Sequence, residues 1–283
     1  MTIVKRGFAD VAHGQIHYRH AGNEVGASED LPLVMLHASP GSSRQLVRLI
    51  EDLGVTRHVI APDTPGNGDS PALAREETTV VRLAEAMLGF LDAMGLERVD
   101  LYGSHTGACI ATELAILAPD RVRGVVLDGV STFTPEELED ILANYAFPFE
   151  PDINGAYLVN LFQFCRDQYM FFPWYNRTRA GRRDNGMGAP ADLHAWATEV
   201  MKAHDTYHFN YRAAFRWNGF DRLPLLTRPA LLLAGENDPL IDQTRDLSAV
   251  VPTGSYVELA RFDDPAFASG RLSAMQAFFA SAQ

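Results

Sequence analysis

Strand-like and helix-like segments alternate along most of this chain, and that alternation restricts its fold more than any other feature. Residues 33–36 form a short apolar run, which is typical of a buried strand. Residues 79–94 carry apolar side chains at helical spacing and are followed by Gly95, a common helix stop. Further strands are expected at 57–61, 99–102, 122–127 and 230–234, with another helix at 108–117. Such alternation predicts a mostly parallel central sheet with helices on both faces.

Two segments depart from this rhythm. Residues 8–21 alternate polar and apolar positions around His13-Gly14, which predicts a hairpin. Residues 132–226 are rich in aromatic side chains and have mainly helical patterning. An insertion of this kind between two sheet strands is expected to form a lid. We therefore predict a core of residues 1–131 and 227–283 and a helical cap of residues 132–226.

Composition restricts the partners of the chain. The formal net charge of −12 argues against nucleic acid and anionic membranes, because both demand clustered Lys and Arg. No apolar run reaches the roughly 20 residues that span a bilayer, and the start does not read as a secretory signal. Cys109 and Cys165 lie in apolar surroundings, which is typical of buried thiols in a reducing compartment. These features predict a cytoplasmic protein, and they leave its oligomeric state open.

Four short motifs follow expected strands in a fixed order. They are His37-Ala38-Ser39-Pro40-Gly41, the loop at 63–70, Gly103-Ser104-His105-Thr106-Gly107 and the loop at 235–239. Together they resemble the α/β-hydrolase family over essentially the whole chain. In that family the motifs would be the oxyanion loop, the Asp-x-Pro-Gly-x-Gly-x-Ser loop, the nucleophile elbow and the loop that carries the acid. The resemblance implies an α/β-hydrolase fold with a cap and a small-molecule substrate.

The chain departs from the family pattern at two positions. The apex of the elbow, where the nucleophile ordinarily stands, is His105, and Ser104 precedes it. The turn is expected to aim Ser104 away from the pocket, so we keep Ser104 only as a candidate binding residue. No histidine follows Asp238, although the family would place one near residues 259–265. A standard Ser-His-Asp relay therefore cannot be assembled in the usual way.

His105 has three functional interpretations that the sequence leaves open. It can act as a general base, since an imidazole titrates near neutrality, or it can attack the substrate itself. It can also belong to a site that only binds a ligand. The fourth interpretation is that His105 is purely structural. A bulky side chain at a strained apex costs conformational free energy, which argues for a function. Asp238 and Asp128 are the two candidates for the carboxylate that orients the imidazole.

The resemblance also implies an oxyanion hole made by the backbone N–H groups of Ser39 and Thr106. His37 is expected to orient that loop, and Ala38 replaces the usual glycine there. Because such a hole stabilises an enolate as well as a tetrahedral intermediate, a lyase or isomerase remains an alternative to a hydrolase.

Further candidates lie in the cap and the hairpin. Trp174 and Tyr175 are candidates for an apolar roof over the substrate. His204 and His208 are one helical turn apart. One of them could lie over His105 when the cap closes, and His208 is our candidate. His13, His17 and His20 do not predict a metal site, because no cysteine or carboxylate beside them completes a ligand set.

The sequence therefore predicts a cofactor-independent enzyme that hydrolyses an ester-like or related bond in a small, partly apolar molecule. We find no P-loop and no Gly-x-Gly-x-x-Gly turn, so no cofactor and no metal are expected. The alternatives are a lyase or isomerase that uses the same histidine and hole, and an inactive ligand-binding protein.

Overall fold

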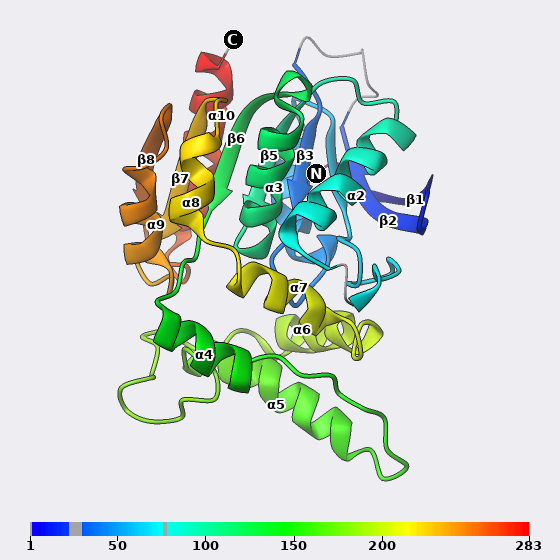
Figure 1. Cartoon of the computed structure of the whole chain (residues 1–283), viewed down its shortest axis with the longest axis vertical. Helices are drawn as coiled ribbons and strands as arrows, with labels where there is room; N and C mark the ends of the chain where they lie inside the picture. Colours follow the sequence, from blue (N-terminus) through cyan, green and yellow to red (C-terminus); the bar gives the residue numbers. More distant parts are fainter. Residues whose placement is uncertain (1, 23–29, 76–77, 283) are drawn as a thin grey trace.

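The computed structural model describes residues 2–22, 30–75 and 78–282. An eight-stranded sheet lies at its centre, in the order β1-β2-β4-β3-β5-β6-β7-β8 (Figure 1). β1 pairs with β2 and β2 with β4 in antiparallel fashion, and the other neighbours are parallel. The strands are β1 (Lys5–Val11), β2 (Gly14–Ala21), β3 (Leu33–Leu36), β4 (Val59–Pro62), β5 (Val99–Ser104), β6 (Val122–Asp128), β7 (Ala230–Gly235) and β8 (Gly254–Leu259). This arrangement confirms the predicted mostly parallel sheet.

Helices cover both faces of the sheet. α2, α3, α8 and α9 lie on one face (Figure 1), and apolar side chains of α2, α3 and α9 share a core with β3, β5 and β6. α1 and α10 cover the other face. These helices are α1 (Val47–Leu53), α2 (Val80–Ala93), α3 (Thr106–Leu117), α8 (Gly219–Arg222), α9 (Ile241–Ser248) and α10 (Pro265–Ser281). β3 and β7 are buried on both faces, which explains why they read as continuous apolar runs.

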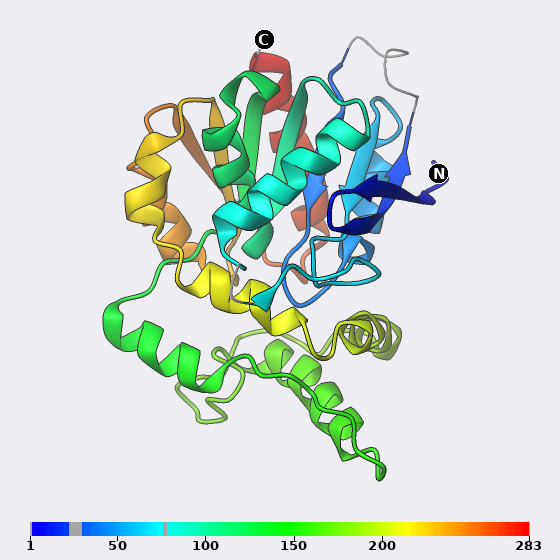
Figure 2. The same cartoon turned by 45° about the vertical axis from the view of Figure 1, so that its right-hand side comes forward.

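A helical cap lies across the carboxyl ends of the parallel strands, between β6 and β7 (Figures 1 and 2). Its helices are α4 (Pro135–Asn144), α5 (Ala156–Met170), α6 (Pro190–Lys202) and α7 (Tyr207–Phe215). The cap has an aromatic core of its own, which includes Tyr145, Phe164 and Tyr207. Ala213 and Ala214 at the end of α7, and Trp217 after it, instead pack into the core of the sheet. The last turn of α7 therefore joins the two cores.

The predicted elements agree with the observed ones to within a few residues. Residues 8–21 form the β1–β2 hairpin, and the predicted helix at 108–117 begins two residues earlier, at Thr106. No individual prediction was made for β8, α9 and α10. β8 is an edge strand whose residues are mostly exposed, so its sequence lacks a strong apolar pattern.

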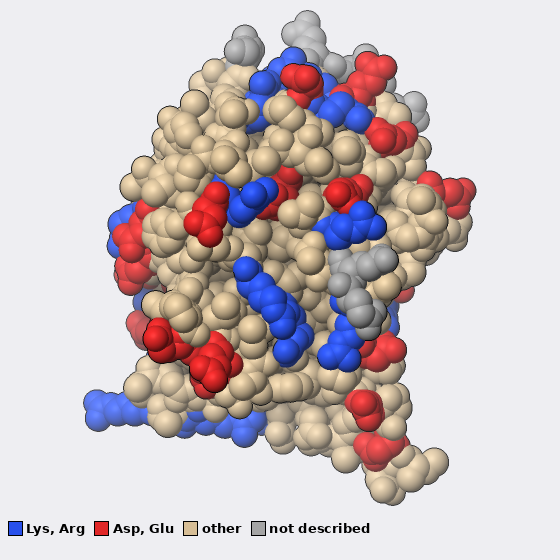
Figure 3. Space-filling view, viewed as in Figure 1, with Lys and Arg blue, Asp and Glu red and all other residues tan. Residues whose placement is uncertain are grey.

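The surface of the described residues is mixed in charge. In the face shown in Figure 3, acidic and basic side chains are interspersed. No helix in the described part of the chain is both long and apolar enough to cross a membrane.

Candidate active site

The elbow between β5 and α3 holds His105 in a strained backbone conformation. Its φ of 50° makes it the one residue other than glycine with a positive φ in the described ranges. The turn is tight: a Cβ on Gly103 would lie 2.2 Å from the Gly107 carbonyl oxygen, and one on Gly107 would lie 2.2 Å from that of Leu36. A backbone of this kind costs about 1–3 kcal/mol and persists only where the surroundings impose it. The turn thereby presents the imidazole to the cavity under the cap.

Asp238 is the carboxylate that the structure brings to His105. Nε2 of His105 lies 3.0 Å from Oδ2 of Asp238, and the other carboxylate oxygen accepts a hydrogen bond from the N–H of Leu240 at 2.8 Å. The Asp238 side chain is buried, whereas about a third (34%) of the His105 side chain is exposed. Burial acts to lower the pKa of His105, but the charge and hydrogen bond of Asp238 outweigh it and raise that pKa above 6.5. The pair is thus an imidazole oriented by a buried carboxylate.

Gly129 makes room for this pair, and no motif in the sequence indicates its role. It follows β6 with a φ of 76°, and a Cβ there would lie 2.7 Å from Nε2 of His105. Any larger residue would displace the imidazole from Asp238.

Asp128 and Ser104 belong to a different cluster. The Asp128 carboxylate accepts hydrogen bonds from the Tyr102 hydroxyl at 2.6 Å and from Arg271 at 3.3 Å. The Ser104 hydroxyl also interacts with Tyr102. Of the two predicted acids, the structure therefore places Asp238, not Asp128, against the apex imidazole. It directs Ser104 to the Tyr102 cluster.

The segment where the family ordinarily has its histidine is occupied by Phe262 and Asp263. Phe262 lines the cavity, and its N–H donates to the Asn237 side chain at 2.9 Å. The acid loop at 235–239 therefore still contacts this segment. Its carboxylate, Asp238, binds the apex histidine directly, with no third residue between them.

The loop predicted to form the oxyanion hole lies beside the apex, where Ser39 and Thr106 line the cavity with His105. Thr106 is the first residue of α3, so its N–H has no acceptor within the helix. His37 supports the loop, because its Nε2 accepts the Thr64 N–H at 2.9 Å while Nδ1 bonds the Ala38 carbonyl. Trp196 of the cap donates from Nε1 to the Pro40 carbonyl at 2.5 Å. The loop is thus held from the core by one side chain and from the cap by another.

The cavity between sheet and cap has a volume of about 950 Å³. Its floor is made by His105, Ser39 and Thr106. We call the cap residues that line it the roof. Its aromatic members are Phe133, Tyr145, Tyr169, Phe171, Phe172, Trp196, Tyr211 and Phe215, and its polar members include Gln168, Arg183, Asn185, Asp192 and Glu199. Such a space suits a small organic molecule with an apolar body.

Residues 32–257 match the family model described as alpha/beta hydrolase fold. The chain belongs to the α/β-hydrolase fold family. It is 29% identical over 180 residues to the 2-hydroxy-6-oxo-6-phenylhexa-2,4-dienoate hydrolase of Burkholderia cepacia, covering 59% of this chain and 62% of that one. It is 32% identical over 165 residues to the 2-hydroxy-6-oxononadienedioate/2-hydroxy-6-oxononatrienedioate hydrolase 2 of Pseudomonas putida, covering 55% and 57%. The similarity thus spans less than two thirds of each of these relatives.

Solved structures show the same fold. The enol-lactonase from Burkholderia xenovorans LB400 superposes with a TM-score of 0.76 at 19% identity, covering 97% of this chain and all (100%) of that one. Epoxide Hydrolase A from Mycobacterium thermoresistibile has a TM-score of 0.70 at 21% identity, with 98% of each chain covered.

Three of the predicted cap residues contact other parts of the cap and are not among the residues that line the cavity. Trp174 donates to the Tyr145 carbonyl at 2.9 Å, and the Tyr175 hydroxyl donates to Asp140 at 2.5 Å. His208 is buried in α7 between the rings of Tyr207 and Phe209. Burial, with help from nearby arginines, lowers the pKa of His208 to about 4. The aromatic part of the roof of this α/β-hydrolase-fold protein is formed by other residues, among them Tyr145 and Tyr211. Alternation along the sequence could not separate side chains of the cap core from those of the roof.

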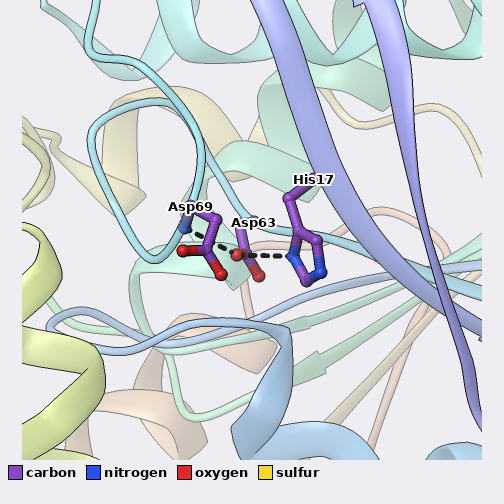
Figure 4. Close-up of side chains that lie close together, drawn as sticks. All are labelled: His17, Asp63 and Asp69. Atoms are coloured by element: carbon purple, nitrogen blue, oxygen red, sulfur yellow. Dashed lines mark hydrogen bonds and ion pairs between the residues drawn. The ribbon is translucent and has the colours of Figure 1, made fainter.

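His17, Asp63 and Asp69 lie close enough to hold a metal ion (Figure 4). Both oxygens of Asp63 are already hydrogen-bonded: one by the N–H and hydroxyl of Ser43, the other by His17 and the Asp69 N–H. Burial opposes ionisation of Asp63, but these donors outweigh it and hold its pKa well below the usual range. Asp63 is therefore a buried, fully hydrogen-bonded carboxylate that joins the β1–β2 hairpin to the loop at 63–70.

Proposed function

We propose that this protein is an enzyme that hydrolyses an acyl, ester-like bond in a small, partly apolar molecule, with His105 as the general base. One observation carries the proposal: the residue at the strained elbow apex is an imidazole that bonds a buried carboxylate directly. An apex imidazole bonded to a carboxylate places at the elbow the base that a serine hydrolase carries on a separate, later loop.

The hydrogen bond to Asp238 determines which ring nitrogen acts. With Nε2–H donating to the carboxylate, Nδ1 carries the lone pair and is the nitrogen left for the cavity. It removes a proton from a water molecule, whose oxygen attacks the substrate carbonyl. The N–H groups of Ser39 and Thr106 stabilise the oxyanion, an interaction worth ~3 kcal/mol or more. The imidazolium then returns the proton to the leaving oxygen as the tetrahedral intermediate collapses.

The base role is favoured over direct attack by His105. Nδ1 is flanked by the Cγ carbon that bears the side chain, so it is more crowded than Nε2 as a nucleophile. Proton transfer tolerates that crowding, because only a hydrogen atom has to reach the nitrogen. The proposal therefore includes no acyl-enzyme.

The relatives support a carbonyl substrate of moderate size. Those named above are hydrolases of unsaturated oxo acids, and one structural neighbour is an enol-lactonase. The cavity has the volume and the aromatic lining for a molecule of that scale. The experiment below tests which acyl chain lengths the protein accepts.

The test compares the natural protein with His105→Ala and Ser104→Ala on p-nitrophenyl esters of rising chain length. We expect His105→Ala to lower kcat/KM by ~10³-fold, in the range of general-base catalysis, and Ser104→Ala to retain activity. Both variants are checked for folding by thermal unfolding. Stopped-flow traces are expected to lack a burst of p-nitrophenol.

Three outcomes would contradict the proposal. Loss of activity in Ser104→Ala alone would indicate that Ser104 is the nucleophile. A burst of p-nitrophenol would indicate an acyl-enzyme. Turnover in ¹⁸O-water without label in the product would indicate a lyase or isomerase.

A further inference from the structure

A chain of hydrogen bonds runs from the cap to the loop at 37–41. It begins at Asn210, a fully buried residue of α7, whose Nδ2 donates to Oγ1 of Thr64 at 3.2 Å. Oγ1 of Thr64 lies 3.2 Å from Nε2 of His37. Nδ1 of His37 in turn lies 2.9 Å from the carbonyl oxygen of Ala38. The three side chains are each at most 1% exposed, so bulk water does not compete for these bonds.

The donors around Thr64 determine the direction of this chain. Its hydroxyl oxygen accepts from Nδ2 of Asn210 and from Nδ2 of Asn67, also at 3.2 Å, and these two donors occupy both of its lone pairs. The hydroxyl hydrogen is therefore left for Nε2 of His37. The backbone N–H of Thr64 donates to the same nitrogen at 2.9 Å, so Nε2 is the acceptor of the ring and Nδ1 carries the proton. That N–H then donates to the Ala38 carbonyl.

His37 connects the chain to the peptide group that precedes the Ser39 nitrogen. Burial lowers the pKa of His37 below 6.5, against the charge of Asp63, so the imidazole is neutral at neutral pH and can both accept and donate. The Ala38 carbonyl and the Ser39 N–H belong to one planar peptide group. A hydrogen bond to that carbonyl fixes the plane and makes the N–H a stronger donor. The chain thus ends on an N–H group that we propose for the oxyanion hole.

We propose that Asn210 is a positioning residue for the oxyanion hole. It acts through Thr64 and His37, which together orient and polarise the Ser39 N–H. The donors all point the same way, from the cap toward the oxyanion, so each one strengthens the next. This inference rests on the proposed function and gives the cap a part in the chemical step. Its effect is expected in kcat and not in KM, because the oxyanion forms only after the substrate has bound.

A second cap hydrogen bond to the loop at 63–70 supplies the matched control. Oγ1 of Thr206, immediately before α7, donates to the Gly66 carbonyl at 2.9 Å. This bond joins the same part of the cap to the same loop, but it does not end on Thr64. Thr206→Val keeps the shape of the side chain and removes the bond, so it measures the effect of cap docking alone.

The test measures kcat and KM on the p-nitrophenyl ester that the natural protein hydrolyses best. Thr64→Val removes the hydroxyl and keeps the backbone N–H, and it is expected to lower kcat by about 10-fold with little change in KM. Asn210→Leu is expected to lower kcat by about 5-fold, because Asn67 still donates to Thr64. Thr64→Ser restores the hydroxyl and is expected to keep most of kcat, and Thr206→Val is expected to leave kcat nearly unchanged.

The double variant Thr64→Val/Asn210→Leu decides whether Asn210 acts through Thr64. If it does, Asn210→Leu lowers kcat no further once the hydroxyl is absent. Losses that multiply in the double variant would overturn the inference, and so would a loss in Thr206→Val as large as that in Asn210→Leu. Thermal unfolding checks that each variant folds, and Asn210→Ala takes the place of Asn210→Leu if the leucine prevents folding.

A spectroscopic measurement separates failure of this inference from failure of the proposed function. The ¹⁵N signals of the His37 imidazole report which nitrogen carries the proton and how strongly the other is hydrogen-bonded, with no turnover required. We expect the proton on Nδ1 in the natural protein, and a weaker hydrogen bond to Nε2 in Thr64→Val and in Asn210→Leu. That result supports the chain even if no ester is hydrolysed, whereas a proton on Nε2 would overturn it. If esters are hydrolysed through His105 but Asn210→Leu keeps the natural kcat, the proposed function stands and the positioning role is rejected.

Discussion

The floor and the roof of the cavity are built in different ways. The floor, to which we now add the supporting residues Asp238 and Gly129, consists of loops that directly follow β3, β5, β6 and β7. Its groups are therefore fixed by strand ends and by single turns. The roof consists of side chains from several cap helices and their connections, held together by aromatic packing and by Gln168. Short-range geometry positions the floor, whereas long-range packing positions the roof. We therefore expect substitutions in the floor to affect the chemical step and those in the roof to affect substrate choice.

The largest effect is expected from Asp238→Asn in the floor. An amide can donate to Nε2 and so stabilise the wrong imidazole tautomer, which removes the lone pair from Nδ1. We expect kcat to fall by about 10³-fold or more, because loss of the orienting carboxylate has effects of this order. Steady-state kinetics measure it. A comparable loss in Asp128→Asn with little change in Asp238→Asn would instead assign the orienting role to Asp128.

Gly129→Ala tests how tightly the floor is packed. The new Cβ would lie 2.6 Å from Cδ2 of His105, so the imidazole has to move, and kcat is expected to fall by about 100-fold. Gly155→Ala is the matched control, since Gly155 also has a positive φ, 72°, but its nearest neighbour would lie 3.8 Å away. Both variants carry the backbone strain of a left-handed residue, roughly 1–2 kcal/mol, which thermal unfolding measures. Equal kinetic losses in the two variants would show that strain, not contact with His105, is responsible.

Trp196→Phe probes the one described hydrogen bond from the cap to the Pro40 carbonyl. The substitution keeps an aromatic ring and removes the N–H donor, so the oxyanion loop is held less firmly. We expect kcat to fall by about 10-fold, equivalent to ~1.4 kcal/mol, with little change in KM. Trp174→Phe loses a similar bond inside the cap and is expected to leave kcat nearly unchanged. Similar losses in both would mean that cap stability, and not the loop, is what Trp196 supports.

The pH profile gives the smallest and most specific test of the floor. Because Asp238 raises the pKa of His105 above 6.5, and because the base must be neutral to act, kcat/KM is expected to increase with pH through a midpoint above 6.5. In Asp238→Asn the residual activity is expected to have a lower midpoint, since burial lowers the pKa of His105 and the largest opposing contribution, that of Asp238, is gone. A profile that is flat between pH 5 and 8 would contradict a catalytic role for His105.

The sequence predicted the floor far better than the roof. The four motifs gave the strand ends, the apex His105, the Ser39 and Thr106 loop positions, and two possible acids. The choice between Asp238 and Asp128 depended on the direction of each side chain at the end of its strand, which no local pattern encodes. Gly129 and Arg183 were missed, because one glycine after a strand and one arginine in a cap have no distinctive spacing.

What the sequence by itself determined is the α/β-hydrolase sheet and the identity of the residue at its elbow. The periods of strands and helices and the glycines of tight turns are local properties, so they can be read along the chain. Only the tertiary structure decided that Asp238 meets His105, that Trp174, Tyr175 and His208 contact other cap residues and do not line the cavity, and that Arg183 lines it. These are relations between segments far apart in the chain, and they depend on how the cap packs over the sheet.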